Sequence, residues 1–149
     1  MHPTDPRPTI YVSSKRTHTQ LWKSFRNRGQ NIISSWIDLE GELDVVTIGR
    51  VYWPIWLHEA ASVNYLIFYT THQDSNHAGN MMEIAACLYA GGTVLQVGVS
   101  ETMKTGSGEL ADFVYHPRWH RLTSLDEAFR IASSFDPDEL QPISPKSVY

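Results

Sequence analysis

The sequence predicts an α/β fold in which a parallel sheet carries helices on both faces. Segments with the composition of strands alternate with segments of helical periodicity along the 149 residues. The run YLIFYT, residues 65–70, is almost continuously apolar, as is usual for a parallel strand covered on both faces. Ligands of such sheets bind at the carboxyl ends of the strands, so we expect the polar residues that follow the strands to form a site.

The first part of the chain is expected to supply a strand, a helix and a second strand. Residues 1–8 are rich in proline and form an extended lead-in, whereas residues 10–14 (IYVSS) are β-branched and aromatic, as in a strand. Residues 18–29 place apolar side chains at helical spacing, with Gly29 as the C-terminal cap. The composition of residues 31–38 (NIISSWID) predicts a second strand.

The rest of the chain continues this alternation. Residues 39–50 are mixed in character, and the sequence leaves helix and loop open there. Pro54 stands in the first turn of the next expected helix, where proline is tolerated, and Ser124 with Glu127 forms a capping box at the start of the last one. The further elements are a helix at 53–63, a strand at 65–70, a helix at 80–92, a strand at 93–98, one or two short strands at 112–124, a helix at 124–135 and an irregular tail at 136–149. Together they predict a single domain over 1–149 of the Rossmann-like or flavodoxin-like class.

Composition and charge exclude several classes of function. Hydrophobic residues make up 42% of the chain and charged residues 19%, which is ordinary for a globular protein. The net charge of -4 and the lack of a long basic run argue against a nucleic-acid polymer as the partner. No stretch has the length and apolarity of a membrane span or of a signal peptide, so we expect a cytoplasmic protein with no membrane partner. The single cysteine, Cys87, has apolar neighbours and is interpreted as a buried thiol rather than a nucleophile.

Glu83 is a lone carboxylate at the start of the apolar helix expected at 80–92. Ala86 and Ala90 lie on the same helical face, and small residues there indicate that something packs closely beside the charge. In one interpretation Asn80 is the N-cap and Glu83 bonds back to its amide as part of a capping box. In the other, Glu83 is a functional carboxylate. The sequence leaves both open.

Two polar clusters come after expected strands. SSKRTHTQ, residues 13–20, combines hydroxyl groups with the cations Lys15 and Arg16, and it suits either a phosphate or anion cradle or a plain polar loop. In SSWID, Trp36 beside Asp38 suits either the stacking and N–H recognition of a planar ring, or a core tryptophan and a turn aspartate.

The seven histidines show no metal-binding spacing. His72 and His77 flank Asp74 in a loop of polar residues, and we interpret them as surface or substrate-contacting groups, with no metal expected. The sequence has no G-x-S-x-G elbow and no evident base for Cys87, so acyl-transfer hydrolysis is unsupported.

Several of these segments resemble the nucleoside 2-deoxyribosyltransferase-like superfamily, which includes deoxyribosyltransferases and 2'-deoxynucleoside 5'-monophosphate N-glycosidases. The resemblance lies in TIYVSS with its early tyrosine, in YLIFYT and in HAGNMMEIAACLYAGGTVLQVG. It covers most of residues 9–134 and is specific around 64–98. The residues that match the family's glutamate-bearing helix start and following glycines are Gly79, Glu83, Ile84, Ala85, Ala86, Gly91, Gly92, Thr93 and Val94.

This resemblance implies a chemistry for Glu83. In the family the matching glutamate is a nucleophile that attacks C1' of a deoxyribose opposite the base, and Tyr11 matches the tyrosine that holds its carboxylate. The loop after the first strand looks like that of the monophosphate-specific members, which slightly favours a 5'-phosphorylated substrate. The anion site implied in this way consists of Ser13, Ser14, Lys15 and Arg16.

The resemblance also implies a small-molecule deoxynucleoside or deoxynucleotide as partner, no cofactor, and a homo-oligomer. Trp36 and Asp38 are then expected to face the base, with Asn64 and His77 near the sugar. Asp74, Gly79 and Asn80 complete the expected substrate-binding residues.

Two departures from the family pattern bear on catalysis. Asn64 stands before YLIFYT where an aspartate is usual, and His77 or the more distant Asp74 stands where another acid often precedes the glutamate. Asn64 cannot titrate, so the general acid stays open between the other two. The replaced acids favour a second hypothesis, a non-catalytic nucleotide-binding or signalling module, whereas the pairing of Tyr11 with Glu83 favours an enzyme.

Overall fold

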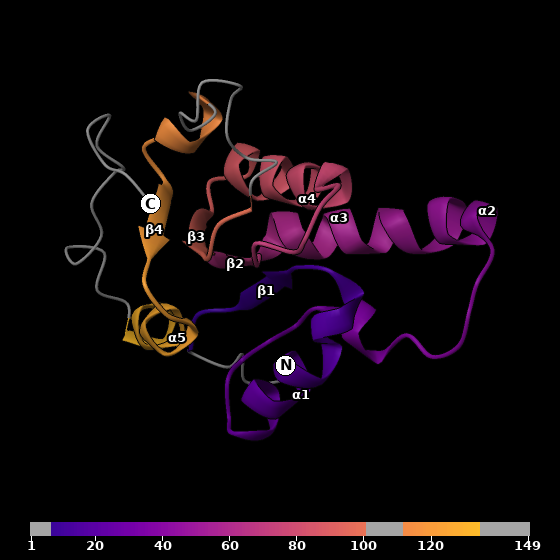
Figure 1. Cartoon of the computed structure of the whole chain (residues 1–149), viewed down its shortest axis with the longest axis horizontal. Helices are drawn as coiled ribbons and strands as arrows, with labels where there is room; N and C mark the ends of the chain where they lie inside the picture. Colours follow the sequence, from indigo (N-terminus) through magenta and orange to yellow (C-terminus); the bar gives the residue numbers. More distant parts are fainter. Residues whose placement is uncertain (1–6, 101–111, 135–149) are drawn as a thin grey trace, which may run out of the picture.

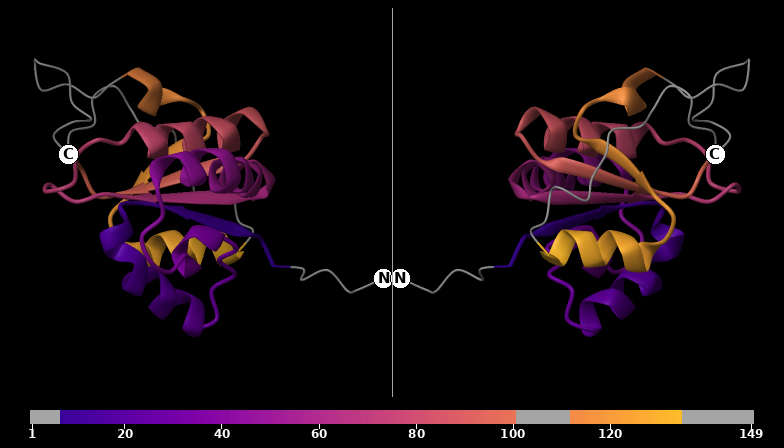
Figure 2. Two further views of the ribbon diagram at one scale, coloured as in Figure 1. Left: turned by 90° about the vertical axis from the view of Figure 1, so that its right-hand side faces the viewer. Right: turned by 90° about the vertical axis from the view of Figure 1, so that its left-hand side faces the viewer.

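Four parallel strands form one sheet, in the spatial order β1-β2-β3-β4, in a computed structural model that describes residues 7–100 and 112–134. The strands are β1 (Ile10–Ser13), β2 (Tyr65–Tyr69), β3 (Thr93–Val97) and β4 (Trp119–Leu122). Helices α3 (Trp53–Ser62) and α4 (Ala78–Tyr89) cover one face, and α1 (Thr19–Asn27) and α5 (Leu125–Ser134) cover the other (Figures 1 and 2). The predicted parallel α/β class with helices on both faces is confirmed.

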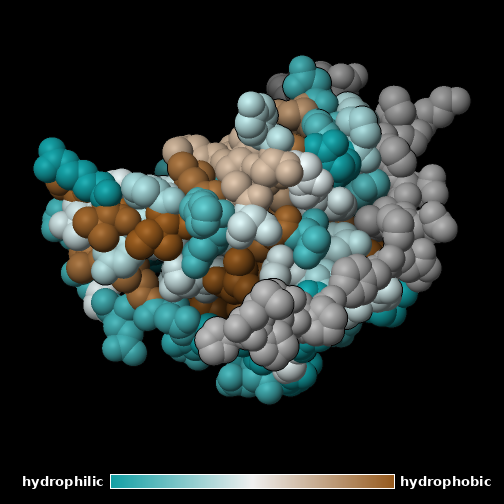
Figure 3. Space-filling model, turned by 180° about the vertical axis from the view of Figure 1, so that it is seen from behind, coloured by the Kyte–Doolittle hydropathy of each residue, from teal (hydrophilic) through white to brown (hydrophobic). Residues whose placement is uncertain are grey.

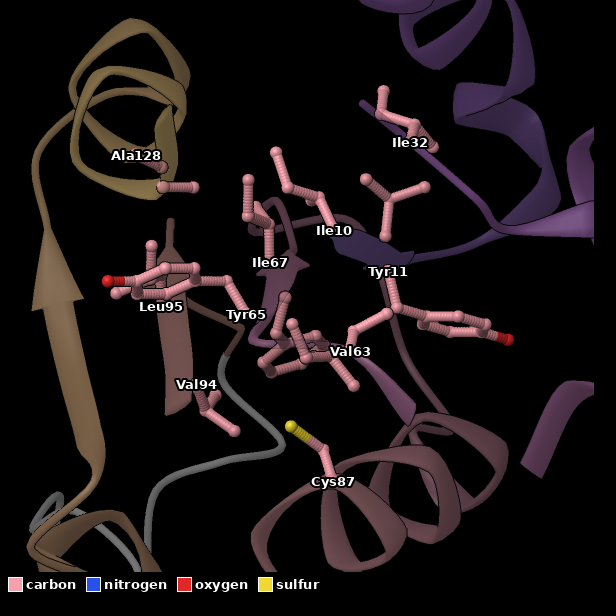
Figure 4. Packing of buried hydrophobic residues seen from close by; sticks show 14 of the residues in the cluster. Ile10, Tyr11, Ile32, Val63, Tyr65, Ile67, Cys87, Val94, Leu95 and Ala128 are labelled. Carbon is pink, nitrogen blue, oxygen red and sulfur yellow. The ribbon is translucent and has the colours of Figure 1, made fainter. Parts of the chain in front are cut away.

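Both faces of the sheet are packed, which is why the two central strands, β2 and β3, are apolar along most of their length. The register places Tyr11, Leu66, Val94 and Trp119 in one row across the four strands. Side chains alternate between the two faces along a strand, so each strand needs an apolar residue at nearly every position. Figure 4 shows the sulfur of Cys87 pointing from α4 toward the sheet, which confirms a buried thiol.

Local sequence features set the ends of three helices, although the capping box predicted before α5 forms only in part. Gly29 follows α1 with a φ of 100°, a left-handed conformation that favours glycine. Pro54 lies in the first turn of α3. The Ser124 hydroxyl accepts the Glu127 N–H at 3.1 Å before α5, although the Glu127 carboxylate bonds to the Thr123 hydroxyl at 2.6 Å and not back to Ser124.

The strand predicted at residues 31–38 is wrong. Only a single bridge joins Ile32 to Ile10, and the chain then enters the 3₁₀ helix η2 (Ser35–Asp38). The hydroxyl of Ser34, and not the backbone carbonyl of Ile33, accepts the next donor of β1, the Val12 N–H, at 2.7 Å. Because the ladder needs backbone partners on both sides, the pairing stops at that point.

Residues 39–50, whose character was open, lead into a short arm of helical turns that ends at Tyr52. Asp44 caps α2 (Val45–Thr47), and the wider π-helical turn η3 (Ile48–Tyr52) leads directly into α3. Pro54 has no N–H for the carbonyl of Arg50, four residues earlier, which accounts for the widening of the turn.

The arm exposes apolar surface. Val45 is 82% exposed, and Val46, Val51 and Ile55 are each about half exposed. The arm lies at one end of the molecule in Figure 1, and Figure 3 shows brown surface gathered at that end. Within the described residues no helix is long and apolar enough to cross a membrane. Most of the expected lead-in and the tail expected at 136–149 lie outside the described residues.

Candidate functional site

Glu83 is buried, and both of its carboxylate oxygens accept hydrogen bonds from β1. The hydroxyl of Tyr11 donates to Oε2, and the hydroxyl of Ser13 donates to Oε1 at 3.0 Å. Tyr11 and Ser13 are two residues apart on one strand and therefore point to the same face, toward α4. Glu83 is only 6% exposed, so its charge depends on these two donors.

The capping interpretation of Glu83 is therefore wrong. Helix α4 begins at Ala78, two residues before Asn80, so Glu83 lies in the second turn, beyond the reach of a capping box. His77 takes the N-cap position without making a side-chain cap.

A chain of buried polar side chains continues from Glu83 toward the end of β2. Asn80 Nδ2 donates to the Ser13 hydroxyl at 2.9 Å, and its Oδ1 lies 3.3 Å from Nδ1 of His77. His77 Nε2 lies 3.4 Å from the Thr70 hydroxyl. His77 is 8% exposed and belongs to this chain rather than to the wall of the neighbouring cavity.

Burial dominates the titration of these groups. It raises the pKa of Glu83 to about 7, against the opposing effect of the hydrogen bonds from Tyr11, Ser13 and Asn80. Burial and the adjacent Glu83 raise the pKa of Tyr11, so its hydroxyl stays protonated and donates. Burial lowers the pKa of His77, so at neutral pH this histidine is uncharged.

A cavity of about 170 Å³ opens beside Glu83 at the carboxyl edge of the sheet. Seven of the residues predicted for the site contribute to its wall, together with three that were not predicted. The predicted ones are Ser14, Lys15, Arg16, Trp36, Gly79, Asn80 and Glu83. The missed ones are Trp53, Trp56 and Asn76. Tyr11 and Ser13 do not line the cavity, and they bond to the Glu83 carboxylate from β1.

Tryptophans make up much of this wall. Trp53 and Trp56 lie on the first turns of α3 with ring centroids 5.3 Å apart, and Trp36 is held by a bond from its indole N–H to the Val12 carbonyl at 2.8 Å. Gly79 has a packing role, because a Cβ there would lie 3.0 Å from the ring of Trp53. The spacing of two tryptophans at the start of a helix was available in the sequence, but the pattern alone equally suits core residues.

The two cations of the cavity are held differently. Lys15 donates through Nζ to the carbonyl of Asn76, whereas the guanidinium of Arg16 lies 5.6 Å from the ring centroid of Trp56. Arg16 is exposed, and stacking on an indole leaves its N–H groups free to meet an anion at the mouth of the cavity.

Three predicted residues lie away from the cavity. Asp38 forms two 2.8 Å bonds with Arg26, which lower the pKa of the carboxyl, and it does not face the cavity. Asn64 precedes β2 and so lies at the amino edge of the sheet, where Oδ1 accepts the Thr9 N–H at 2.9 Å. Asp74 accepts the Thr71 N–H at 2.8 Å and pairs with His18 at 3.1 Å.

These placements correct the expected roles. Asp38 does not reach a base in the cavity, and Asn64 does not reach a sugar there, because strand direction puts it at the opposite edge. Burial raises the pKa of Asp74, but its bonds from Thr71 and His18 outweigh this and keep it below the usual range. Neither Asp74 nor His77 is among the residues that line the cavity.

Other chemistries receive no support from the described residues. Among residues 7–100 and 112–134, no group of three or more His, Cys, Asp or Glu side chains is placed to hold a metal ion. Burial raises the pKa of Cys87 to about 12, so it is not a thiolate nucleophile.

The sequence matches no protein-family model and no curated protein. The structure is similar to that of a 2-deoxyribosyltransferase from the psychrotolerant bacterium Bacillus psychrosaccharolyticus, with a TM-score of 0.58 and 14% sequence identity. The similarity covers 91% of this chain and 99% of that chain. At this level of identity the likeness is one of fold, and it extends over nearly the whole of both molecules.

Proposed function

We propose that this protein cleaves or exchanges the N-glycosidic bond of a 2'-deoxynucleoside or its 5'-monophosphate through a covalent glycosyl intermediate on Glu83. The observation that carries the proposal is a buried carboxylate at a cavity, with both oxygens held by donors from one strand. Such a group is oriented and desolvated, as a carboxylate nucleophile needs to be. The fold shared with a 2-deoxyribosyltransferase supports the same chemistry.

The reaction proceeds in two displacements. An oxygen of ionised Glu83 forms a bond to C1' of the sugar while the C1'–N bond breaks, and the base leaves with the bonding electrons and takes up a proton. Water or a second base then attacks C1' from the vacated side and restores free Glu83. Water gives hydrolysis, and a second base gives transfer.

The donors around Glu83 serve both steps. Tyr11 and Ser13 stabilise the carboxylate before attack and again when it departs from C1'. With its pKa at about 7, Glu83 is a better nucleophile than an ordinary solvated carboxylate and is still largely ionised in weakly basic solution.

The cavity wall suits the remaining parts of such a substrate. Tryptophan rings provide flat apolar surfaces for a base, and Lys15 with Arg16 provides positive charge for a 5'-phosphate. We therefore propose a 5'-monophosphate as the preferred form. The homo-oligomer and the absence of a cofactor remain expectations that the family resemblance implies.

The second candidate is a nucleotide-binding module without catalysis. One observation favours it: among the described residues of the cavity wall, Glu83 is the only acid, so no carboxylic general acid faces the leaving base.

Release of free base separates the two candidates. Wild-type protein is incubated with 2'-deoxynucleosides and their 5'-monophosphates, with and without an acceptor base, and the products are separated by chromatography. We expect base release that falls at least about a thousandfold in Glu83→Gln and is unchanged in the exposed control Glu42→Gln. The glycosyl intermediate is measured as added sugar mass on the peptide that contains Glu83. Ligand binding without base release in the wild type would establish the binding module instead.

A further inference from the structure

Glu59, on α3, is a carboxylate that the proposed chemistry does not use. It is partly buried and does not line the cavity. Its Oε1 accepts two hydrogen bonds from Ser35, one from the backbone N–H at 3.1 Å and one from the hydroxyl at 2.8 Å. Ser35 is the first residue of η2, and the preceding Ser34 supplies no side-chain cap. Glu59 therefore caps this turn from a different helix.

The capped turn carries Trp36, one of the three tryptophans of the cavity. Bonds from the Trp36 indole to the Val12 carbonyl and from the Val12 N–H to Ser34 tie this segment to β1. Glu59 ties the same segment to α3, which carries the other two tryptophans. It thereby fixes the separation between the two aromatic walls of the cavity.

The charge of Glu59 also acts on the reacting carboxylate. Burial is the main cause of the raised pKa of Glu83, the hydrogen bonds from Tyr11, Ser13 and Asn80 oppose it, and the negative charge of Glu59 makes the smallest contribution. The other ionisable groups around Glu83 are Tyr11 on β1, Lys15 and Arg16 in the cavity wall, and His77 before α4.

We propose that Glu59 is a positioning residue, which holds Trp36 at the cavity through Ser35. This role rests on the glycosidic function proposed for Glu83. The hydrogen bonds and the charge are separable by substitution, because an amide oxygen can replace the carboxylate as an acceptor without carrying its charge.

Three variants separate the two contributions in a pH profile of kcat/KM. Glu59→Gln keeps an acceptor for Ser35 and loses the charge, so we expect a KM close to that of the wild type and an acid limb displaced to lower pH. Ser35→Ala keeps the charge and loses the hydroxyl bond, so we expect KM to rise, by up to about tenfold, with the acid limb in place. Glu59→Ala combines both effects.

Nuclear magnetic resonance tests the same role without turnover. The carboxyl carbon of Glu83 is titrated in the wild type and in Glu59→Gln, and the indole N–H resonance of Trp36, assigned with Trp36→Phe, is compared in all variants. We expect a lower titration midpoint in Glu59→Gln and a displaced indole resonance in Ser35→Ala and Glu59→Ala.

The outcomes are distinguishable. An unmoved Trp36 resonance in both Ser35→Ala and Glu59→Ala, or a KM unchanged in both variants, would overturn the role of Glu59. A wild type that binds nucleotides but releases no base would overturn the glycosidic function alone, and the resonance measurements would still decide how Glu59 acts on Glu83 and Trp36.

Discussion

The two faces of the sheet differ in the kind of side chain that they bury. On the α1 and α5 face, aromatic rings pack on one another. The ring centroid of Phe129 lies 4.4 Å from that of Phe25, in a stacked arrangement, and 6.3 Å from that of Trp22, edge to face. On the α3 and α4 face, Tyr11 and Ser13 hold a buried carboxylate. Burial of apolar rings stabilises the fold, whereas burial of a carboxylate costs free energy that its donors only partly return. The α1 and α5 face is thus packed with apolar rings, whereas the α3 and α4 face, which also buries Trp56 and Ile84, carries the carboxylate of the proposed chemistry.

The largest effect should come from the aromatic face. Phe129→Ala removes a fully buried ring from the stack with Phe25, and we expect it to lower the free energy of unfolding by about 3 to 5 kcal/mol. Urea denaturation measures the loss, and kcat/KM of the folded variant should stay close to that of the wild type. A large loss of turnover in the folded variant would mean that the two faces are not independent.

On the polar face, substitution of Glu83 should raise the free energy of unfolding rather than lower it. The pKa of Glu83 is about 7 in the folded protein against a usual 4.5, so the folded state binds the proton more tightly. The contribution of Glu83 to stability is then greatest below pH 4.5 and falls as pH rises to about 7, by on the order of 3 kcal/mol. Glu83→Gln should therefore be more stable than the wild type at pH 8, and this gain should shrink at pH 5.

Denaturation of both proteins at the two pH values gives the comparison directly. Equal stability differences at pH 5 and pH 8 would show that Glu83 does not titrate in this range.

A smaller effect is expected from the donor to Glu83. Tyr11→Phe removes a bond that favours the ionised carboxylate, so the pKa of Glu83 should rise above its value of about 7. We expect kcat/KM at pH 7 to fall by about tenfold and to recover partly at higher pH. Tyr69→Phe, on the aromatic face beside Trp22, is the matched control and should leave the profile in place.

The smallest effect is expected at the exposed pair of Arg26 and Asp38. Their side chains are 33% and 54% exposed, so solvent screens the attraction in spite of its good geometry. Asp38→Asn should change the free energy of unfolding by less than about 1 kcal/mol and leave base release unaltered. A marked change in substrate preference would return Asp38 to the base-binding role that its position argues against.

The sequence predicted the strands and helices whose periodicity is strong, and it failed where a side chain replaced a backbone partner. Residues 65–70 were clear because a buried parallel strand is apolar throughout. Residues 31–38 had the composition of a strand, but the hydroxyl of Ser34 ends the pairing, and no periodicity reveals such a bond. The start of α4 was placed two residues late, which left the capping interpretation of Glu83 open.

Within the site, the position of a residue before, within or after its strand predicts its location better than its charge does. Tyr11 lies beside Glu83, as the family resemblance implies, whereas Ser13 was expected in the anion site and instead donates to the Glu83 carboxylate from the same face of β1. Asn64 was misplaced because it precedes its strand, and residues before a parallel strand lie at the wrong edge. Trp53 and Trp56 were missed because their spacing is equally typical of a helix core.

The π-helical turn between α2 and α3 has a consequence for helical phase. A turn with one extra residue rotates the preceding helix, here α2, by roughly 100° relative to its direction in a regular α-helix. In this phase α3 buries Trp56 and Ala60, while the valines of α2 face outward. A deletion of one residue from Ile48–Tyr52 would keep the tryptophans at the cavity only by turning Val45 and Val46 to another side of the arm. The direction of the apolar arm is thus set by the length of a single turn, independently of the site beside it.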